Sequence, residues 1–356
     1  MVDWKSENSL GNQKIEIRNL SIFYFLEPFS IIHLTIFKML TSKPTNLQEN
    51  VGLATHTTFR IGGPARYFAA VKNNEELIEA VKWTKENSLP FFILGGGSNL
   101  LVSDEGYEGL VIKCQMTNFQ CQKESDKLKI ICGAGVPFGK AIMETSKQGY
   151  SGAEWGFGIP GTIGGALCGN AGRLGQDISK IVQEITILDA DLNIKKLTRE
   201  ECEFDYRHSR FKETREIILS AVLEFTKKDQ MAIDEVLNEA KAVVKHSPPF
   251  SSAGCIFKNY RTMGEQDELL KNHPELAGRV RGGKLGVGFL IDQCGLAGRQ
   301  IGGAKVWEGH ANYIVNVGGA KAEDVLELIK LVREAVKAKY GIELEEEVRY
   351  LGNYKL

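Results

Sequence analysis

The alternation of apolar and polar residues predicts short strands and a few amphipathic helices. Tyr67–Val71, Phe91–Leu94 and Gly109–Cys114 are apolar runs of strand length. Between the first two, a helical pattern begins behind a capping box at Asn73 and ends before Pro90. We therefore predict a β-α-β unit in which Phe91–Leu94 is a buried strand, within a small α/β subdomain over residues 51–115.

Further apolar runs predict two more domains. Leu128–Cys132, Val182–Asp189 and Ile217–Phe225 are of strand length and suggest a second subdomain over residues 116–228. Helical periodicity at Met231–Lys245 and Ala322–Tyr340 predicts helices that begin and close a third domain over residues 229–346. On the first of these helices we expect one apolar side, formed by Ile233, Val236, Ala240 and Val243.

The first fifty residues do not fit this series, and we expect them to be an extension outside the core. Their most apolar stretch is Ser21–Phe37, which Glu27 and Pro28 divide into pieces too short to span a bilayer. It also lacks the basic start and small-residue cleavage site of a signal peptide. No membrane association is expected.

Composition narrows the class of protein. The chain has 356 residues with 44 Lys+Arg against 45 Asp+Glu. This near-zero net charge gives no indication of a nucleic-acid partner. Its seven cysteines include no C-x-x-C pair, so neither a metal site nor a disulfide framework is predicted. A reducing, cytoplasmic location is expected.

Two glycine-rich runs are the strongest sign of a ligand. The first follows the strand at Phe91–Leu94, and the second is GFGIPGTIGGALCGNAG, residues 156–172. Without Cβ atoms the backbone approaches a ligand closely, and successive N–H groups bind phosphate. Neither run fits the Rossmann fingerprint or a Walker A motif. A tight turn and a packing corner remain alternatives. The expected cofactor-binding residues are Gly95, Gly96, Gly97, Ser98, Asn99, Gly161, Ile163, Gly164 and Gly165.

Two other segments carry reactive side chains. ECEFDYRHSRFK, residues 201–212, has Arg207 near its centre, although such a charge run is usually a solvated face. SSAGCIFKNY, residues 251–260, contains Cys255, although a lone cysteine is more often a small buried hydrophobe. Neither segment is informative alone.

Taken in order, seven motifs resemble the UDP-N-acetylenolpyruvoylglucosamine reductase family. They are HTTFRIGGPA, ILGGGSNLLVSD, GIPGTIGGALCGNAG, YRHSRFK, SAGCIFKN, LIDQCGLAGRQIGGA and LEEEVRYLG. The resemblance implies an α+β chain with an FAD-binding fold of the vanillyl-alcohol-oxidase (PCMH) type. Two α/β subdomains would hold FAD, a C-terminal α/β domain would cover the substrate, and residues 347–356 would pack on the first subdomain. No insert matches the extra tyrosine loop of the longer subgroup.

The resemblance also implies a reaction and its residues. NADPH would reduce the flavin, which would pass a hydride to the enolpyruvyl ether of a UDP-sugar. Arg207 matches the family's residue that binds the substrate carboxylate. Glu347 matches the family's carboxylic acid that contacts the enolate-like state of the substrate. Many members carry serine as the proton donor, where this chain has Cys255, whose ordinary pKa of about 8.5 leaves it mostly protonated at neutral pH. The implied substrate contacts are Asn259, Gln293 and, on a less regular motif, Lys245.

Several alternatives stay open at this point. Glu345 and Glu346 adjoin Glu347, so the acidic residue could be displaced by one position. Another flavin oxidoreductase of the same fold would explain the glycine-rich runs, although not SAGCIFKN and LEEEVRYLG. A flavin- or nucleotide-binding protein without catalysis is the rival of a different class. We expect the protein to act as a monomer.

Overall fold

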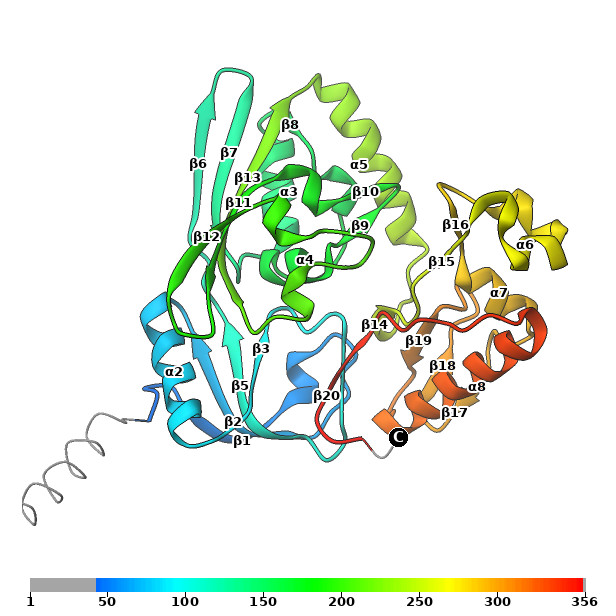
Figure 1. The fold of residues 1–356 in the computed structure, drawn as a ribbon, viewed down its shortest axis with the longest axis horizontal. Helices are drawn as coiled ribbons and strands as arrows, with labels where there is room; N and C mark the ends of the chain where they lie inside the picture. The colour runs from blue at the N-terminus through cyan, green and yellow to red at the C-terminus, as the bar shows by residue number, and fades with distance from the viewer. Residues whose placement is uncertain (1–42, 355–356) are drawn as a thin grey trace, which may run out of the picture.

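The structure, a computed structural model, describes residues 43–354. The three largest sheets form three adjoining bodies, drawn in blue to cyan, in green and in yellow to red in Figure 1. The apolar stretch Ser21–Phe37 lies outside the described residues. The extension boundary at residue 50 needs correction, because strand β1 (Gln48–Gly52) already pairs with the first sheet.

The first sheet has the strand order β1-β2-β5-β3. β2 (Pro64–Val71), β3 (Phe91–Leu94) and β5 (Tyr107–Cys114) run parallel, and α2 (Asn74–Glu86) connects β2 to β3. The predicted β-α-β unit is therefore confirmed, with Asn73 capping the helix by accepting from the Glu76 N–H. The prediction that β3 is a buried strand is wrong: β3 is an edge strand, and Leu94 is its one buried residue.

The second sheet is antiparallel, with the order β12-β11-β13-β7-β6 and β8 beside β13. Its bounds are β6 Phe119–Glu124, β7 Lys127–Gly133, β8 Tyr150–Ser151, β11 Val182–Leu188, β12 Ile194–Thr198 and β13 Ile217–Lys227. The long connections carry α3 (Phe138–Ser146) and α4 (Ile163–Gly169), which contains part of the second glycine-rich run. One hydrophobic core extends from α2 and β5 through this sheet, so the two N-terminal subdomains are packed as a unit.

The third sheet lies in the C-terminal part, with the order β14-β19-β18-β17. Its strands are β14 Ser251–Cys255, β17 Gln300–Ile301, β18 Ala304–Val306 and β19 Tyr313–Asn316. The helix α5 (Gln230–Lys245) leads into it, and α7 (Val287–Gln293) and α8 (Ala322–Tyr340) pack in its core. On α5 the buried residues are Ile233, Leu237 and Ala240, whereas Val243 is 39% exposed, so the expected apolar side was placed slightly wrong.

The chain returns to the first body at its end. β20 (Arg349–Leu351) pairs in parallel with β4 (Leu100–Val102), which directly follows the first glycine-rich run. Figure 1 shows this last segment in red, crossing from α8 to the blue and cyan strands. Leu101 also enters the core of the C-terminal part. The C-terminal part is thus joined to the first body by both strand pairing and packing.

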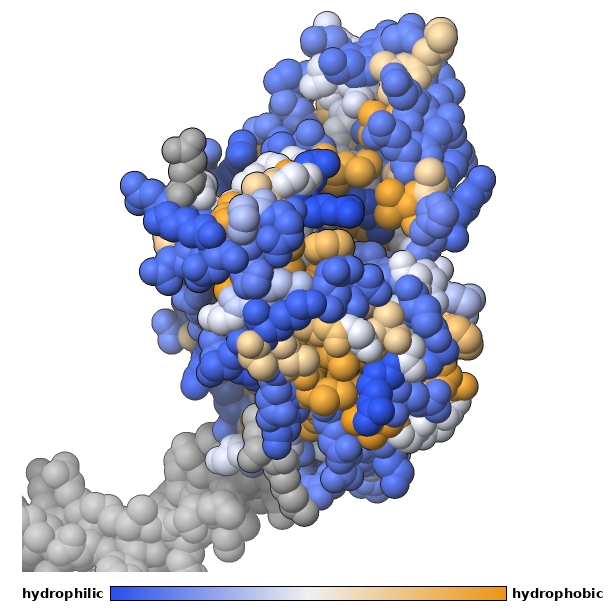
Figure 2. All heavy atoms as spheres, turned by 90° about the vertical axis from the view of Figure 1, so that its right-hand side faces the viewer, coloured by the Kyte–Doolittle hydropathy of each residue, from blue (hydrophilic) through white to orange (hydrophobic). Residues whose placement is uncertain are grey.

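The remaining elements are short. They are β9 Gly172–Arg173, β10 Gln176–Asp177, β15 Tyr260–Arg261, β16 Lys284–Leu285, α6 Glu268–Asn272, and the 3-10 turns at Leu53–His56, Glu154–Gly156, Ile178–Ile181, Glu200–Cys202, Arg210–Lys212, Gly264–Gln266 and Pro274–Arg279. Within residues 43–354, no helix combines the length and apolarity needed to cross a membrane. The face in Figure 2 is mainly hydrophilic, with areas of apolar side chains between the polar ones.

Candidate active site

The two glycine-rich runs, about sixty residues apart in sequence, touch each other. A Cβ on Gly96 would lie 2.6 Å from Cα of Gly161, and one on Gly95 would lie 2.6 Å from Oγ1 of Thr162. The Ser98 hydroxyl donates to the carbonyl of Pro160 at 2.9 Å. Glycine is required here because any larger residue would separate the two backbones. Direct contact between the runs explains why both are so poor in side chains.

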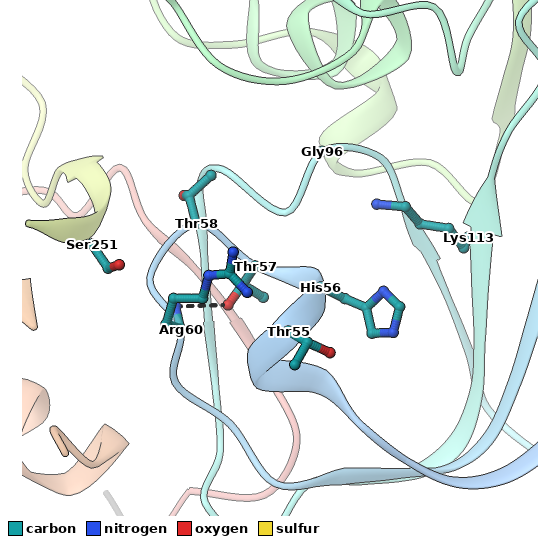
Figure 3. A pocket seen from close by; sticks show the side chains of 8 residues that line it. All are labelled: Thr55, His56, Thr57, Thr58, Arg60, Gly96, Lys113 and Ser251. Carbon is teal, nitrogen blue, oxygen red and sulfur yellow. Dashed lines mark hydrogen bonds between the residues drawn. The ribbon is translucent and has the colours of Figure 1, made fainter. Parts of the chain in front are cut away.

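A polar pocket of about 480 Å³ opens beside this junction (Figure 3). It is lined by Thr55, His56, Thr57, Thr58, Arg60, Gly96, Lys113 and Ser251. Arg60 and Lys113 supply positive charge, and the Lys113 ammonium also donates to the Gly95 carbonyl. Burial lowers the pKa of His56, helped by the charge of Lys113, which favours a neutral imidazole. Exposed backbone, hydroxyls and two cations suit the pyrophosphate of a dinucleotide, so the residues present fit FAD.

Asn99 connects this junction to the C-terminal segment. Its side-chain amide donates to the carbonyl of Glu347 at 3.0 Å, and its carbonyl accepts from the N–H of Arg349 at 3.1 Å. The side chains of Ser98 and Asn99 are therefore both used in contacts with other parts of the chain. Because the backbone of Glu347 is held by the first glycine-rich run, the predicted acidic residue is fixed next to the predicted cofactor loop.

Arg207 stands at the tip of a tight turn. Asp205 and His208 exchange both backbone hydrogen bonds, at 3.1 and 3.0 Å, so Tyr206 and Arg207 are the two residues between them. Arg207 has φ 53°, a left-handed conformation that costs free energy for a residue with a side chain. Lys212 stabilises the turn by donating to the Arg207 carbonyl at 2.6 Å. The charged segment is therefore a constrained turn rather than a solvated face.

The side chains of Arg207 and Glu347 meet where the turn of the second body reaches the C-terminal segment. Nε of Arg207 lies 2.7 Å from Oε1 of Glu347, and the two side chains are 23% and 18% exposed. The Nε–H is not aimed at that oxygen, so this buried nitrogen has an ion-pair contact but no aligned hydrogen bond. A guanidinium has five N–H donors, so the remaining N–H groups of Arg207 can bind an incoming carboxylate.

The environment of Glu347 favours its neutral form. Burial raises the pKa of the Glu347 carboxyl, against the opposing charges of Arg207 and Lys212. The neighbouring acids are engaged elsewhere: Glu345 pairs with Lys258, and Glu346 lies 3.1 Å from Arg333 and accepts from the Tyr350 hydroxyl. Of the three consecutive glutamates, Glu347 is the one that contacts Arg207.

Cys255 is the last residue of β14 and lies beside the Arg207–Glu347 pair. It is a half-buried free thiol, with some surface toward solvent and charged groups around the rest. Burial raises the pKa of Cys255 to about 12, Glu347 adds to this effect, and Arg207, a hydrogen bond from Tyr313 and Arg173 oppose it. The thiol therefore keeps its proton at any physiological pH, more firmly than an ordinary cysteine would.

Sequence reasoning missed three residues of this cluster. Arg173, the residue directly after the second glycine-rich run, interacts electrostatically with Cys255 and is held by donating to the Phe157 carbonyl at 2.9 Å. Lys212 faces Glu347 as well as the Arg207 turn. Tyr313 hydrogen-bonds to Cys255 from the neighbouring strand. Arg173 directly follows the second glycine-rich run, outside the quoted motif, and Tyr313 lies in an apolar run that resembles an ordinary strand.

The three expected substrate contacts lie in different places. Asn259 is near the Arg207 turn: its N–H donates to the Tyr206 hydroxyl at 3.2 Å, and its side-chain oxygen accepts from the first N–H of α7 at 3.3 Å. Lys245 is exposed at the end of α5, next to Val244, which packs against Gly158. Gln293 is exposed at the end of α7, where its carbonyl accepts from Lys339. The roles of Lys245 and Gln293 stay predictions.

A second pocket, of about 370 Å³, lies beside Tyr206. It is lined by Asp205, Tyr206, His208, Lys258, Asn259, Tyr260, Arg261, Val287, Glu343, Leu344 and Glu345. Arg261 forms two hydrogen bonds with Asp205, at 2.9 and 2.7 Å, and its guanidinium lies 5.2 Å from the centre of the Tyr206 ring. The pocket thus adjoins the Arg207 turn and combines cations with an aromatic face.

A polar pocket at the junction of two glycine-rich runs, together with an arginine, a buried carboxyl of raised pKa and a protonated thiol, defines an FAD-dependent oxidoreductase with a separate substrate domain. Residues 65–198 match the family model of the FAD binding domain, and residues 246–351 that of the UDP-N-acetylenolpyruvoylglucosamine reductase C-terminal domain. The chain belongs to the UDP-N-acetylenolpyruvoylglucosamine reductase family.

Individual relatives agree with this assignment and with the fold predicted from the sequence. The chain is 38% identical to the Bacillus velezensis reductase of that name over 85% of this chain and 93% of the relative. It is 37% identical to the Bacillus subtilis reductase, again over 85% and 93%. The crystal structure of the Thermus caldophilus reductase matches with a TM-score of 0.69 at 30% identity, covering 86% of this chain and 99% of that one.

Proposed function

We propose that the protein reduces the enolpyruvyl ether of UDP-N-acetylglucosamine enolpyruvate to UDP-N-acetylmuramate, using FAD and NADPH, in peptidoglycan precursor synthesis. The observation that carries this proposal is the meeting of Arg207, Glu347 and Cys255, which come from three distant segments. The family to which the chain belongs and the names of its relatives agree with this reaction.

The cofactor would lie along the junction of the two glycine-rich runs. The backbone of Gly95–Asn99 and of the turn from Gly161 to Gly165 would hold the pyrophosphate, with Arg60 and Lys113 neutralising its charge. When bound, FAD supplies the hydride that NADPH provides. The protein's own part is to exclude water, to orient the two reactants and to control charge and one proton.

Each residue of the cluster has a separate task in that scheme. Arg207 binds the enolpyruvyl carboxylate through its planar guanidinium and stabilises the negative charge that develops on it. Burial raises the pKa of Glu347, which favours the protonated carboxyl that can donate a hydrogen bond to the enolate-like oxygen. Cys255 gives its proton to the adjacent carbon, and Arg173 stabilises the thiolate that remains.

The nucleotide part of the substrate would extend into the pocket beside Tyr206. Lys258 and Arg261 line that pocket, and Lys284 lies 4.5 Å from the centre of the Tyr206 ring. These cations suit a diphosphate, and the Asn259 amide adds a hydrogen-bonding group. Because the pocket adjoins the Arg207 turn, one extended UDP-sugar would place its diphosphate there and its enolpyruvyl group at Cys255.

The competing function is that of an oxidase of the same fold, which would pass electrons to oxygen. Steady-state NADPH oxidation separates the two. We expect the purified yellow protein to oxidise NADPH at a high rate only after the enolpyruvyl UDP-sugar is added, with UDP-N-acetylmuramate as the product. Rapid oxidation without the sugar, matched by hydrogen peroxide formation, would instead identify an oxidase. Cytoplasmic location and the monomeric state stay predictions from the sequence.

A further inference from the structure

Tyr313 lies directly across the sheet from Cys255. The two residues are Cα partners in the antiparallel pairing of β14 with β19, next to a register irregularity between Ser252 and Cys255. Their side chains therefore emerge on the same face. The Tyr313 hydroxyl and the Cys255 sulfur form a side-chain hydrogen bond. This contact fixes the position of the sulfur from outside its own strand.

The direction of this hydrogen bond follows from the two groups. Burial raises the pKa of Tyr313, so its hydroxyl is protonated, and a phenolic O–H is a far better donor than a thiol. Tyr313 therefore donates to the sulfur, which leaves the S–H proton directed elsewhere. The other charged or titratable groups that face the thiol are Glu347, Arg207 and Arg173.

The ring of Tyr313 is itself held in place. It makes edge contacts with His310 at 5.3 Å and with Trp307 at 6.2 Å between ring centroids. Burial lowers the pKa of His310, so this neighbour is a neutral ring rather than a competing cation. Arg173 interacts electrostatically with both Tyr313 and Cys255. The phenol thus has a fixed orientation toward the sulfur.

We propose that Tyr313 is a positioning residue, which aims the Cys255 S–H at the substrate carbon and stabilises the thiolate left after proton transfer. In that step the S–H bond breaks, a C–H bond forms at the carbanionic carbon, and the negative charge moves to sulfur. Tyr313 keeps its own proton and donates the hydrogen bond to the thiolate, which then regains a proton from water. The inference rests on the proposed role of Cys255.

The first test measures the thiol without turnover. Iodoacetamide modification of the Cys255 peptide is followed by mass spectrometry between pH 7 and 9, in the FAD-loaded protein and its Tyr313→Phe variant. Losing a hydrogen bond to the thiolate lowers the thiolate fraction, so the rate in the variant falls about tenfold or more at each pH. Tyr354→Phe is the matched control, because that hydroxyl donates to the distant Leu101 carbonyl at 2.7 Å. Equal rates in wild type and Tyr313→Phe overturn the proposal.

The second test measures the two half-reactions. Tyr313→Phe should slow reoxidation of the reduced flavin by the UDP-sugar at least tenfold and leave reduction by NADPH unchanged. In a Cys255→Ala background, Tyr313→Phe should slow reoxidation by a smaller factor, because no thiol is left to position. The proposal is overturned if Tyr313→Phe slows both half-reactions equally. It is also overturned if Tyr313→Phe slows reoxidation as much in the Cys255→Ala background as in wild type, because Tyr313 then has a purely structural role. If Cys255→Ala is fully active while modification still depends on Tyr313, the role of Cys255 in the reaction fails but the hydrogen bond stands.

Discussion

Nε of Arg207 lies 2.7 Å from Oε1 of Glu347, although 140 positions separate the two residues in the chain. One comes from a strained turn of the second body, and the other from the segment that returns to the first glycine-rich run. Their contact places a cation and an acid next to the thiol of a third segment. This cluster of side chains therefore suits a substrate that carries a carboxylate.

Arg207→Lys should not be a conservative change. Lysine keeps the positive charge but lacks the planar group that binds a carboxylate through two parallel hydrogen bonds. We expect reoxidation of the reduced flavin by the UDP-sugar to slow about a hundredfold or more, with reduction by NADPH little changed. Rapid-mixing absorbance spectroscopy of each half-reaction measures this. Equal damage to both would show that Arg207 serves the cofactor or the fold.

Glu347→Gln should slow the reaction with the UDP-sugar about a hundredfold while FAD remains bound. The amide still donates a hydrogen bond but cannot share a proton with the developing enolate. Glu346→Gln is the matched control, because Glu346 contacts Arg333 and Tyr350 rather than Arg207. If Glu346→Gln is the damaging change and Glu347→Gln is silent, the assignment of the acid is displaced by one residue.

The pH profile should have an alkaline limb that belongs to Glu347 rather than to Cys255. Burial raises the pKa of Glu347, so its active neutral form is present below that pKa and is lost as the pH rises through it. The pKa of Cys255 is raised to about 12, which keeps the thiol protonated over the range of the assay. Cys255→Ser should therefore retain both activity and the limb, whereas Glu347→Gln should lose the limb. A limb that disappears in Cys255→Ser would contradict this assignment.

Gly96→Ala should weaken FAD binding and lower the melting temperature. Its Cβ would lie 2.6 Å from Cα of Gly161, so the two glycine-rich runs would have to separate, at a cost of about 1–3 kcal/mol. Gly139→Ala in α3 is the control, since its Cβ would meet no atom within 4 Å and alanine favours a helix. Thermal unfolding and FAD titration measure both variants. If Gly96→Ala leaves the FAD affinity unchanged, the junction of the two glycine-rich runs is not part of the cofactor site.

Local pattern was sufficient for most of the fold. The helix α8 has the predicted bounds, Ala322–Tyr340, with Gly341 in the left-handed conformation at its end, because its apolar spacing and cap are both local signals. The burial of β3 was mispredicted because an apolar run does not reveal whether a strand lies at the edge of its sheet. The start of β1 was missed because Gln48–Gly52 is mostly exposed and has no apolar alternation.

Site residues could be predicted only where they lie in a motif shared with the family. Arg207, Cys255 and Glu347 were found through the resemblance, and the structure brings them together. Tyr313 and Arg173 were missed because their proximity to Cys255 depends on strand pairing and on the packing of separate bodies. Asn99 also holds the backbone of Glu347, which lies 248 positions away in the sequence. No pattern near either residue predicts this contact.

The most direct test of the account is the anaerobic reaction of the NADPH-reduced protein with the enolpyruvyl UDP-sugar, followed by flavin absorbance in wild type, Cys255→Ser and Cys255→Ala. We expect the oxidised spectrum to return with formation of UDP-N-acetylmuramate in the first two proteins. In Cys255→Ala, which NADPH still reduces at the normal rate, product formation should fail. A wild-type protein that the UDP-sugar does not reoxidise would contradict the proposed function, and a fully active Cys255→Ala protein would contradict the assignment of the proton donor.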